Sequence, residues 1–164
     1  MSKTVAELTA IAHQHAAAEG AGDLAATLAT LEAEPSYELY PVALRMTGMD
    51  RARRYYEHFF ANVAPRITGY EMLGEWTNEQ GVLQEYRLRV RGDDGMRDFR
   101  IMGLLKFGRS ALSGERLYAG EELLRLLFEP LWEEPRARLG LRSLKRPRLR
   151  VLSVCRRSGA YLLA

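Results

Sequence analysis

The sequence of 164 residues contains almost no cysteine. Cys155 is the only one, so an intramolecular disulfide and a zinc site with several cysteine ligands are both excluded. No apolar run reaches about 18 residues, which excludes a membrane-spanning helix. Glu7 and His13 interrupt the stretch that a signal peptide would need to keep apolar. We therefore expect a protein that is not exported by this route and is cytoplasmic.

The last 29 residues lack acidic side chains. Residues 136–164 hold nine Lys and Arg and no Asp or Glu. The whole chain has 24 basic and 21 acidic residues, so residues 1–135 have 15 basic and 21 acidic side chains and a net charge of −6. Such asymmetry can mark a nucleic-acid-binding tail. The tail has a single aromatic residue, Tyr161, so a solvated extension is the simpler interpretation.

The first part of the chain has helical periodicity. Thr4 and Glu7 have the spacing of a capping box before an amphipathic stretch, which predicts a helix over about residues 5–18. Asp23 can cap a second, short helix that carries Leu31 and ends before Pro35. Residues 36–42 favour a short extended segment. A further helix follows Gly48, with apolar residues recurring up to Val63.

Beyond Pro65 the period changes from 3.6 to 2. This change predicts strands near 67–76, 82–91, 97–107 and 113–119, followed by a last helix over 121–129. In the second strand the alternation puts Val82, Gln84, Tyr86, Leu88 and Val90 on the core face. Helices followed by a run of strands with short turns predict an α+β fold.

The third predicted strand is apolar on both faces. Phe99, Ile101 and Leu105 form one face, but Met102 and Leu104 on the opposite face are apolar too. A sheet that is partly apolar on both sides needs a covering partner. A second copy of the chain is the simplest partner, so we expect a homodimer.

Three segments resemble one family in order and spacing. AAAEGAGDLAATLATLEAEPSYELYP resembles its helix, Gly-Asp break, helix and short strand that ends near a proline. TGMDRARRYYEHFF resembles its helix with terminal aromatics, and ERLYAGEELLRLL its closing strand and C-terminal helix. The family is the nuclear transport factor 2-like superfamily, in its SnoaL-like and ketosteroid-isomerase-like branch, with a cystatin-like cone.

This resemblance implies a domain over residues 1–130 and a basic extension over 131–164 outside the family fold. It implies a strongly curved antiparallel sheet wrapped around the N-terminal helices, with a conical pocket open at one end and commonly a homodimer. Members include isomerases, polyketide cyclases, hydratases and binding proteins, so the fold does not name a reaction.

The resemblance also gives positions for catalytic residues. His15 occupies the helix position that resembles the family's oxyanion-binding Tyr, and can donate a hydrogen bond, act as a base, or be satisfied locally in the core. Tyr40 stands where the family's carboxylate base lies, with Glu38 two residues earlier. The matching positions for further acids hold Gly103 and Gly120, so the usual isomerase and cyclase mechanisms are not supported.

The remaining side chains expected inside the cone are aromatic or amide-bearing: His15, Tyr40, Tyr70, Met72, Trp76, Gln84, Tyr86 and Tyr118. Such a lining suits a flat, mainly apolar metabolite with one or two polar handles, or it simply fills the core. His13 and His15 project in different directions from a helix, so we expect no metal site, and no motif indicates a cofactor.

The sequence therefore predicts a small-molecule-binding protein of the SnoaL-like type. The alternatives are an enzyme of the isomerase, polyketide cyclase or hydratase type that uses His15 with Glu38 or a Tyr hydroxyl, and an interaction protein that uses the basic tail. We expect no membrane partner, and nucleic acid only through the tail.

Overall fold

The computed structural model describes residues 3–134 and 137–138. Its helices, including one π and two 3₁₀ segments, are α1 (Val5–Ala21), α2 (Leu24–Ala29), α3 (Met49–His58), η1 (Phe59–Val63), η2 (Ala64–Arg66), α4 (Glu121–Phe128) and η3 (Glu129–Leu131). Its strands are β1 (Leu31–Tyr40), β2 (Leu44–Thr47), β3 (Ile67–Asn78), β4 (Gly81–Gly92), β5 (Gly95–Phe107), β6 (Leu112–Tyr118) and β7 (Ala137–Arg138). The α+β class and the predicted order of elements are confirmed.

Local signals explain where the first helices begin and end. The Glu7 carboxylate accepts from the Thr4 backbone N–H at 2.8 Å, and the Thr4 hydroxyl accepts from the Glu7 N–H at 3.3 Å, which completes the predicted capping box. Gly22 ends α1 in the left-handed conformation, at φ 69°. The Asp23 carboxylate then caps α2 by accepting from Ala26 N–H at 2.9 Å.

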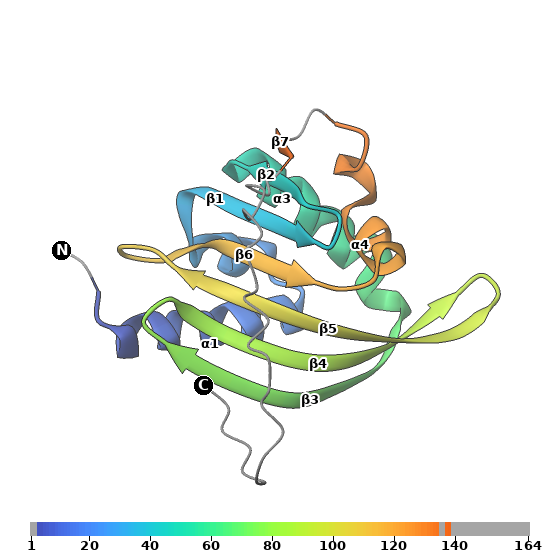
Figure 1. Ribbon diagram of the computed structural model, residues 1–164, viewed down its shortest axis with the longest axis horizontal. Coiled ribbons are helices and arrows are strands. Elements are labelled where there is room, and N and C mark those ends of the chain that lie inside the picture. The colour runs from blue at the N-terminus through green and yellow to red at the C-terminus, as the bar shows by residue number, and fades with distance from the viewer. Residues whose placement is uncertain (1–2, 135–136, 139–164) are drawn as a thin grey trace, which may run out of the picture.

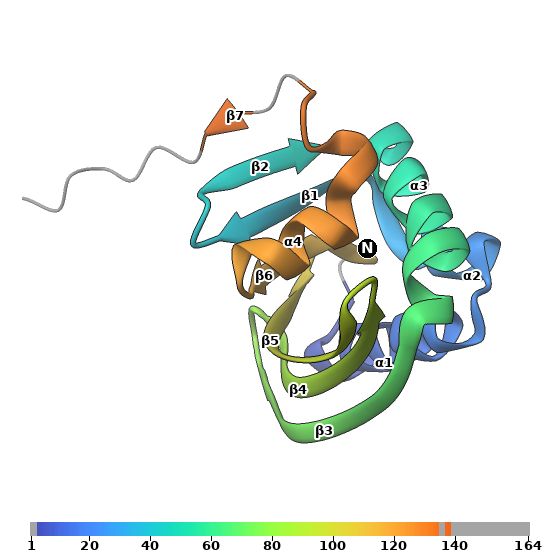
Figure 2. The same cartoon turned by 90° about the vertical axis from the view of Figure 1, so that its right-hand side faces the viewer.

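The strands form one curved sheet in the order β3-β4-β5-β6-β1-β2-β7. Neighbours are antiparallel except β1 and β6, which are parallel. Figures 1 and 2 show that β3, β4 and β5 bend around α1, while α3 and α4 lie near the β1 end. At Gly114, φ is 117° and an added Cβ would lie 2.2 Å from the Ser36 carbonyl oxygen, so only glycine permits this approach of β6 to β1.

Three features differ from the sequence-based expectations. β1 starts at Leu31, so this residue lies in a strand rather than in the second helix, and β2 was not predicted. Leu131 and Trp132 are buried, and Ala137–Arg138 pairs with β2, so the fold continues past residue 130. The rest of the basic tail, with Cys155 and Tyr161, lies outside the described residues.

An aromatic cluster packs α3 and α4 onto the sheet. The rings of Tyr55 and Phe128 stack with centroids 4.3 Å apart, and Tyr37 of β1 packs against both. Together with Tyr56 and Phe59, these side chains are buried. The cluster stabilises the packing of these helices on the sheet, because such rings bury large apolar areas in fixed geometries. No helix in the described part of the chain is long and apolar enough to span a membrane.

Candidate functional site

A cavity of about 440 Å³ lies between α1 and the concave face of the sheet. The aliphatic and small residues of its wall come from α1, η2, α4 and strands β3 to β6: Ala16, Gly20, Ala64, Ile67, Leu88, Ile101, Leu105, Leu117 and Leu127. The aromatic and polar lining consists of His15, Glu19, Tyr55, Phe59, Tyr70, Gln84, Tyr86 and Glu115. An apolar cavity of this size with a few polar groups is typical of a small-molecule site.

Glu115 of β6 directs its carboxyl group into this cavity. Its side chain is only 9% exposed, and it forms no hydrogen bond or ion pair with any residue in 3–134 or 137–138. Gly103 on the neighbouring strand β5 makes room for it, because a Cβ at position 103 would lie 2.7 Å from Glu115 Oε1. Because the matching position holds Gly103, no acid was expected from the sequence at this place in the cone. That expectation was wrong, since β6 supplies a carboxyl group there.

Glu19 is the second acid of the cavity. It follows His15 by one helical turn on α1, and its side chain remains 30% exposed. Loss of hydration raises the pKa of Glu115 to about 8, and the negative charge of Glu19 adds to the effect. Loss of hydration also raises the pKa of Glu19, to about 7. The two carboxyl groups therefore titrate as an interacting pair near neutral pH.

His15 belongs to a continuous chain of buried hydrogen bonds. The Thr30 hydroxyl donates to the Thr27 carbonyl at 2.6 Å, so it must accept from His15 Nδ1–H, also at 2.6 Å. Nε2 is then the unprotonated nitrogen and accepts from the Tyr56 hydroxyl at 2.9 Å. Burial lowers the pKa of His15 to about 4, so the ring is neutral at pH 7. With both nitrogens occupied, the ring holds α1 against α2 and α3.

Four residues expected inside the cone line the cavity. His15, Tyr70, Gln84 and Tyr86 face it from α1, β3 and β4. Met72 stands opposite Tyr86 in the β3–β4 register but is 41% exposed and lies outside the cavity wall.

Trp76 lies on the opposite, convex face of the sheet, and its placement in the cone was wrong. Met72 pairs with Tyr86 but Gly74 pairs with Glu85, so one extra residue, Leu73, forms a bulge in β3. A bulge moves every later side chain to the other face. Trp76 consequently packs over Gly74, whose missing Cβ leaves space for the indole ring.

Glu75 takes the inward position that the strict alternation had given to Trp76. Its carboxylate accepts from Gln84 Nε2 at 2.7 Å and contacts His13 Nε2 at 3.0 Å. The edge strand β3 is thereby linked to α1.

Tyr40 and Tyr118 are also outside the cone. Their rings stack on the convex face, with centroids 5.0 Å apart and an interplanar angle of 13°. Tyr40 follows Leu39, which is fully buried on the concave side, so the alternation of β1 directs Tyr40 outward. Tyr118 borders a shallow groove of about 400 Å³ with Trp76, Leu83, Met102 and Leu104.

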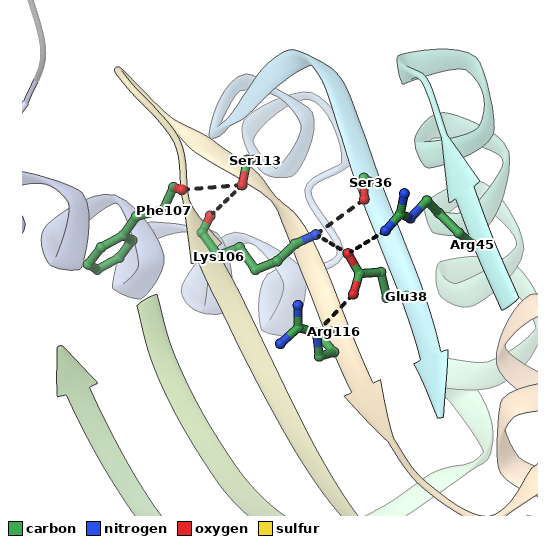
Figure 3. Close-up of polar contacts among 7 residues, drawn as sticks. All are labelled: Ser36, Glu38, Arg45, Lys106, Phe107, Ser113 and Arg116. Carbon is green, nitrogen blue, oxygen red and sulfur yellow. Dashed lines mark hydrogen bonds and ion pairs between the residues drawn. The ribbon is translucent and has the colours of Figure 1, made fainter. Parts of the chain in front are cut away.

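Glu38 does not reach the cone either, because it lies between Tyr37 and Leu39, which both face the core. Figure 3 shows its carboxylate among three cations on the convex face. Arg116 Nε and Lys106 Nζ donate to it at 2.9 and 3.2 Å, and Arg45 lies 3.5 Å away. Burial alone would raise the pKa of Glu38, but the hydrogen bond from Arg116 and the charge of Lys106 outweigh it and lower the pKa.

Sequence reasoning missed the two acids of the cavity, although each left a signal. Glu115 shares its strand face with Leu117, so alternation alone would direct it inward. Glu19 is at i+4 from His15, a buried position of α1. The sequence does not show that these two carboxyl groups are buried without a cationic side chain beside them, because that depends on the tertiary structure. In the described part of the chain, no group of three or more His, Cys, Asp or Glu could hold a metal ion.

No family model and no curated protein matches the sequence. Solved structures do match the fold. A protein with a cystatin-like fold from Silicibacter pomeroyi is 11% identical, with a TM-score of 0.58 over 75% of this chain and 83% of that one. An NTF2-like protein from Cytophaga hutchinsonii is 11% identical, with a TM-score of 0.58 over 69% and 99%.

A third structure, from Catenulispora acidiphila, has a ketosteroid isomerase-like fold and was solved in complex with trimethylamine. It is 17% identical, with a TM-score of 0.51 over 66% of this chain and 83% of that one. These likenesses agree with the resemblance seen in the sequence motifs and with the curved sheet around α1. The chain has the NTF2-like, cystatin-like fold.

Proposed function

We propose that the protein binds a small, mainly apolar molecule in the cavity of the cone. The observation that carries this proposal is the cavity itself, about 440 Å³ and walled mainly by aromatic and aliphatic side chains. Its few uncommitted polar groups, above all the Glu115 carboxyl, can orient a polar handle of the ligand. The complex of the Catenulispora acidiphila structure with trimethylamine supports small-molecule binding on a similar fold.

Calorimetric titration with 2-phenylethanol, a flat ring with one polar handle, tests this proposal. Tyr86 lines the cavity and Tyr118 lies on the convex face, so they form a matched pair of tyrosines. We expect saturable binding that Tyr86→Ala weakens at least tenfold and Tyr118→Ala leaves unchanged. Binding that depends on Tyr118 but not on Tyr86 would place the site on the other face of the sheet.

A second candidate function is acid–base catalysis of the isomerase, cyclase or hydratase type. The observation that favours it is the Glu115 carboxyl, which is free in the cavity and has a pKa raised to about 8, so it can give up or accept a proton near neutral pH. An enzyme would lose turnover in Glu115→Gln and keep it in Glu85→Gln, whose carboxylate pairs with Arg100 on the convex face.

We also propose that a second copy of the chain covers the convex groove. Trp76 and Tyr118 are 54% and 42% exposed there and stand beside Leu83, Met102 and Leu104. A contiguous exposed apolar patch of this kind marks an interaction site.

A further inference from the structure

We propose that the ligand of the cone is an organic cation, and that the carboxyl groups of Glu19 and Glu115 bind its protonated amine. This inference rests on the proposed function and names the chemical class of the ligand. It starts from Glu115, a polar side chain that is nine-tenths buried, directed into the cavity and without a hydrogen-bond partner among the described residues. The described residues hold no fully buried polar side-chain atom without a partner, so the Glu115 oxygens are accessible from the cavity and a molecule in the cavity must supply their donor.

The cavity is rich in hydrogen-bond acceptors and poor in donors. Glu19 and Glu115 together present four carboxyl oxygens. Few donors surround them: His15 Nδ1–H binds Thr30, and one of the two N–H groups of Gln84 Nε2 donates to Glu75. The hydroxyl groups of the lining tyrosines can donate or accept. An ammonium group has only donors, three in a primary amine, and so complements this lining.

No cationic side chain of the described residues lines the cavity. The positive charge that acts on Glu115 is that of Lys106. The Lys106 ammonium is engaged on the convex face, where it binds Ser36 and Glu38 at 3.2 Å. When both carboxyl groups are ionised they repel each other, with only the charge of Lys106 to offset it among the described residues, and a ligand cation supplies the missing charge.

The remaining walls suit an organic cation better than a metal ion. Tyr55, Tyr70 and Tyr86 bring three aromatic rings to the cavity, and aromatic faces attract alkylated ammonium groups. The acids and histidines of the described residues do not come close enough together to ligate a metal. The apolar volume beyond the carboxyl groups accommodates the hydrocarbon part of an amine.

Binding should release protons. The charged and titratable groups around the pair are His15 on α1, Tyr37 on β1, Tyr55 and Tyr56 on α3, Tyr70 on β3, Tyr86 on β4 and Lys106 on β5. His15 is neutral, and burial raises the pKa of each of these tyrosines, so none of them ionises near neutral pH. Burial also keeps the carboxyl pair partly protonated at pH 7. An ammonium favours the ionised carboxylate, so the displaced proton passes to solvent.

Calorimetric titration with two probes of the same shape tests the inference. 2-Phenylethylamine is a cation and 2-phenylethanol its neutral counterpart. At pH 8 we expect the amine to bind at least tenfold more tightly than 2-phenylethanol. The affinity for the amine should rise from about pH 6 to about pH 8, because the carboxyl pair ionises over this range. Titrations in two buffers of different ionisation enthalpy should show proton release on binding.

The variants Glu115→Gln and Glu19→Gln separate this inference from a structural effect. Each should weaken the amine at least tenfold. Binding of 2-phenylethanol should change by no more than about twofold, because the Gln amide keeps an acceptor for a hydroxyl group and loses only the negative charge. Glu85→Gln on the convex face should change neither. Equal binding of both probes, or amine binding that tightens as the pH falls, would overturn the amine proposal and leave the cavity function standing. Failure of both probes to bind would overturn both proposals.

Discussion

Two glutamates of neighbouring strands show how the surroundings decide the chemistry of one residue type. Glu38 is buried among three cations on the convex face, and its pKa is lowered. Glu115 is equally buried on the concave face without a cation, and its pKa is raised. The first carboxylate stabilises the fold, whereas the second destabilises it at neutral pH. Buried charged groups that lower the stability of a fold are typical of functional sites.

Glu115→Gln should therefore stabilise the empty protein. A carboxyl whose pKa is higher in the folded than in the unfolded state contributes stability that is complete below the unfolded value of 4.5 and is lost as the pH rises through about 8. We expect the free energy of unfolding at pH 8 to increase by about 1–3 kcal/mol. The gain should vanish near pH 4.5. Urea unfolding across this range measures it, and a loss of stability at pH 8 would show that Glu115 has an internal partner.

His15→Ala should destabilise the protein by about 2–4 kcal/mol, because it leaves a void and removes the hydrogen bonds of the ring to the buried hydroxyl groups of Thr30 and Tyr56. Tyr56→Phe leaves no large void but removes two hydrogen bonds, to His15 and from the Tyr37 hydroxyl, and should cost about 1–2 kcal/mol. Urea unfolding of both variants gives these values. If His15→Ala were as stable as the wild type but unable to turn over a substrate, His15 would be catalytic rather than structural.

At the scale of elements, strand periodicity predicts β4 and β5 well. Val82, Leu88, Val90, Ile101 and Leu105 are buried on the expected face. Periodicity fails in β3, because the extra residue at Leu73 reverses the faces beyond it. Bulges have no reliable signal in a single sequence, so Trp76 was placed inside and Glu75 was missed. The parallel pairing of β1 with β6 depends on long-range packing and was equally invisible.

Glu38 links β1 to β5 and β6, so Glu38→Ala should destabilise the sheet by about 2–4 kcal/mol. The lowered pKa of Glu38 means that its contribution is present above its unfolded pKa and is lost as the pH falls through the folded value. The matched control is Glu71→Ala, which removes an exposed carboxylate 3.3 Å from Arg87 on β4 and should cost less than about 1 kcal/mol. Equal losses in denaturant unfolding would contradict the structural role of Glu38.

At the scale of the whole molecule, the two faces of one sheet differ. The concave face lines the cavity, and the convex face carries an apolar groove and the Glu38 cluster. The sequence predicts the cone and the second apolar face, because both depend on the composition of long strands. It does not predict the acidic pair, because Glu19 and Glu115 are 96 positions apart in the chain and meet only in the folded cone.

Trp76→Glu should break the proposed dimer, because it places a charge in the groove that the second copy would cover. Light scattering at high micromolar concentration should give twice the 18.6-kDa chain mass for the wild type and one chain mass for the variant. Met96→Glu changes an exposed methionine outside the groove and should remain dimeric. A monomeric wild type would contradict the dimer.

The central claim is that the concave cavity binds a small molecule. The most direct measurement is a titration followed by NMR of the methyl groups, with 2-phenylethylamine and 2-phenylethanol as ligands. The account predicts saturable shifts at Leu88, Ile101 and Leu117 inside the cone and none at Leu83 and Leu104 on the convex face. Shifts confined to Leu83 and Leu104, or unchanged spectra with both ligands, would contradict it.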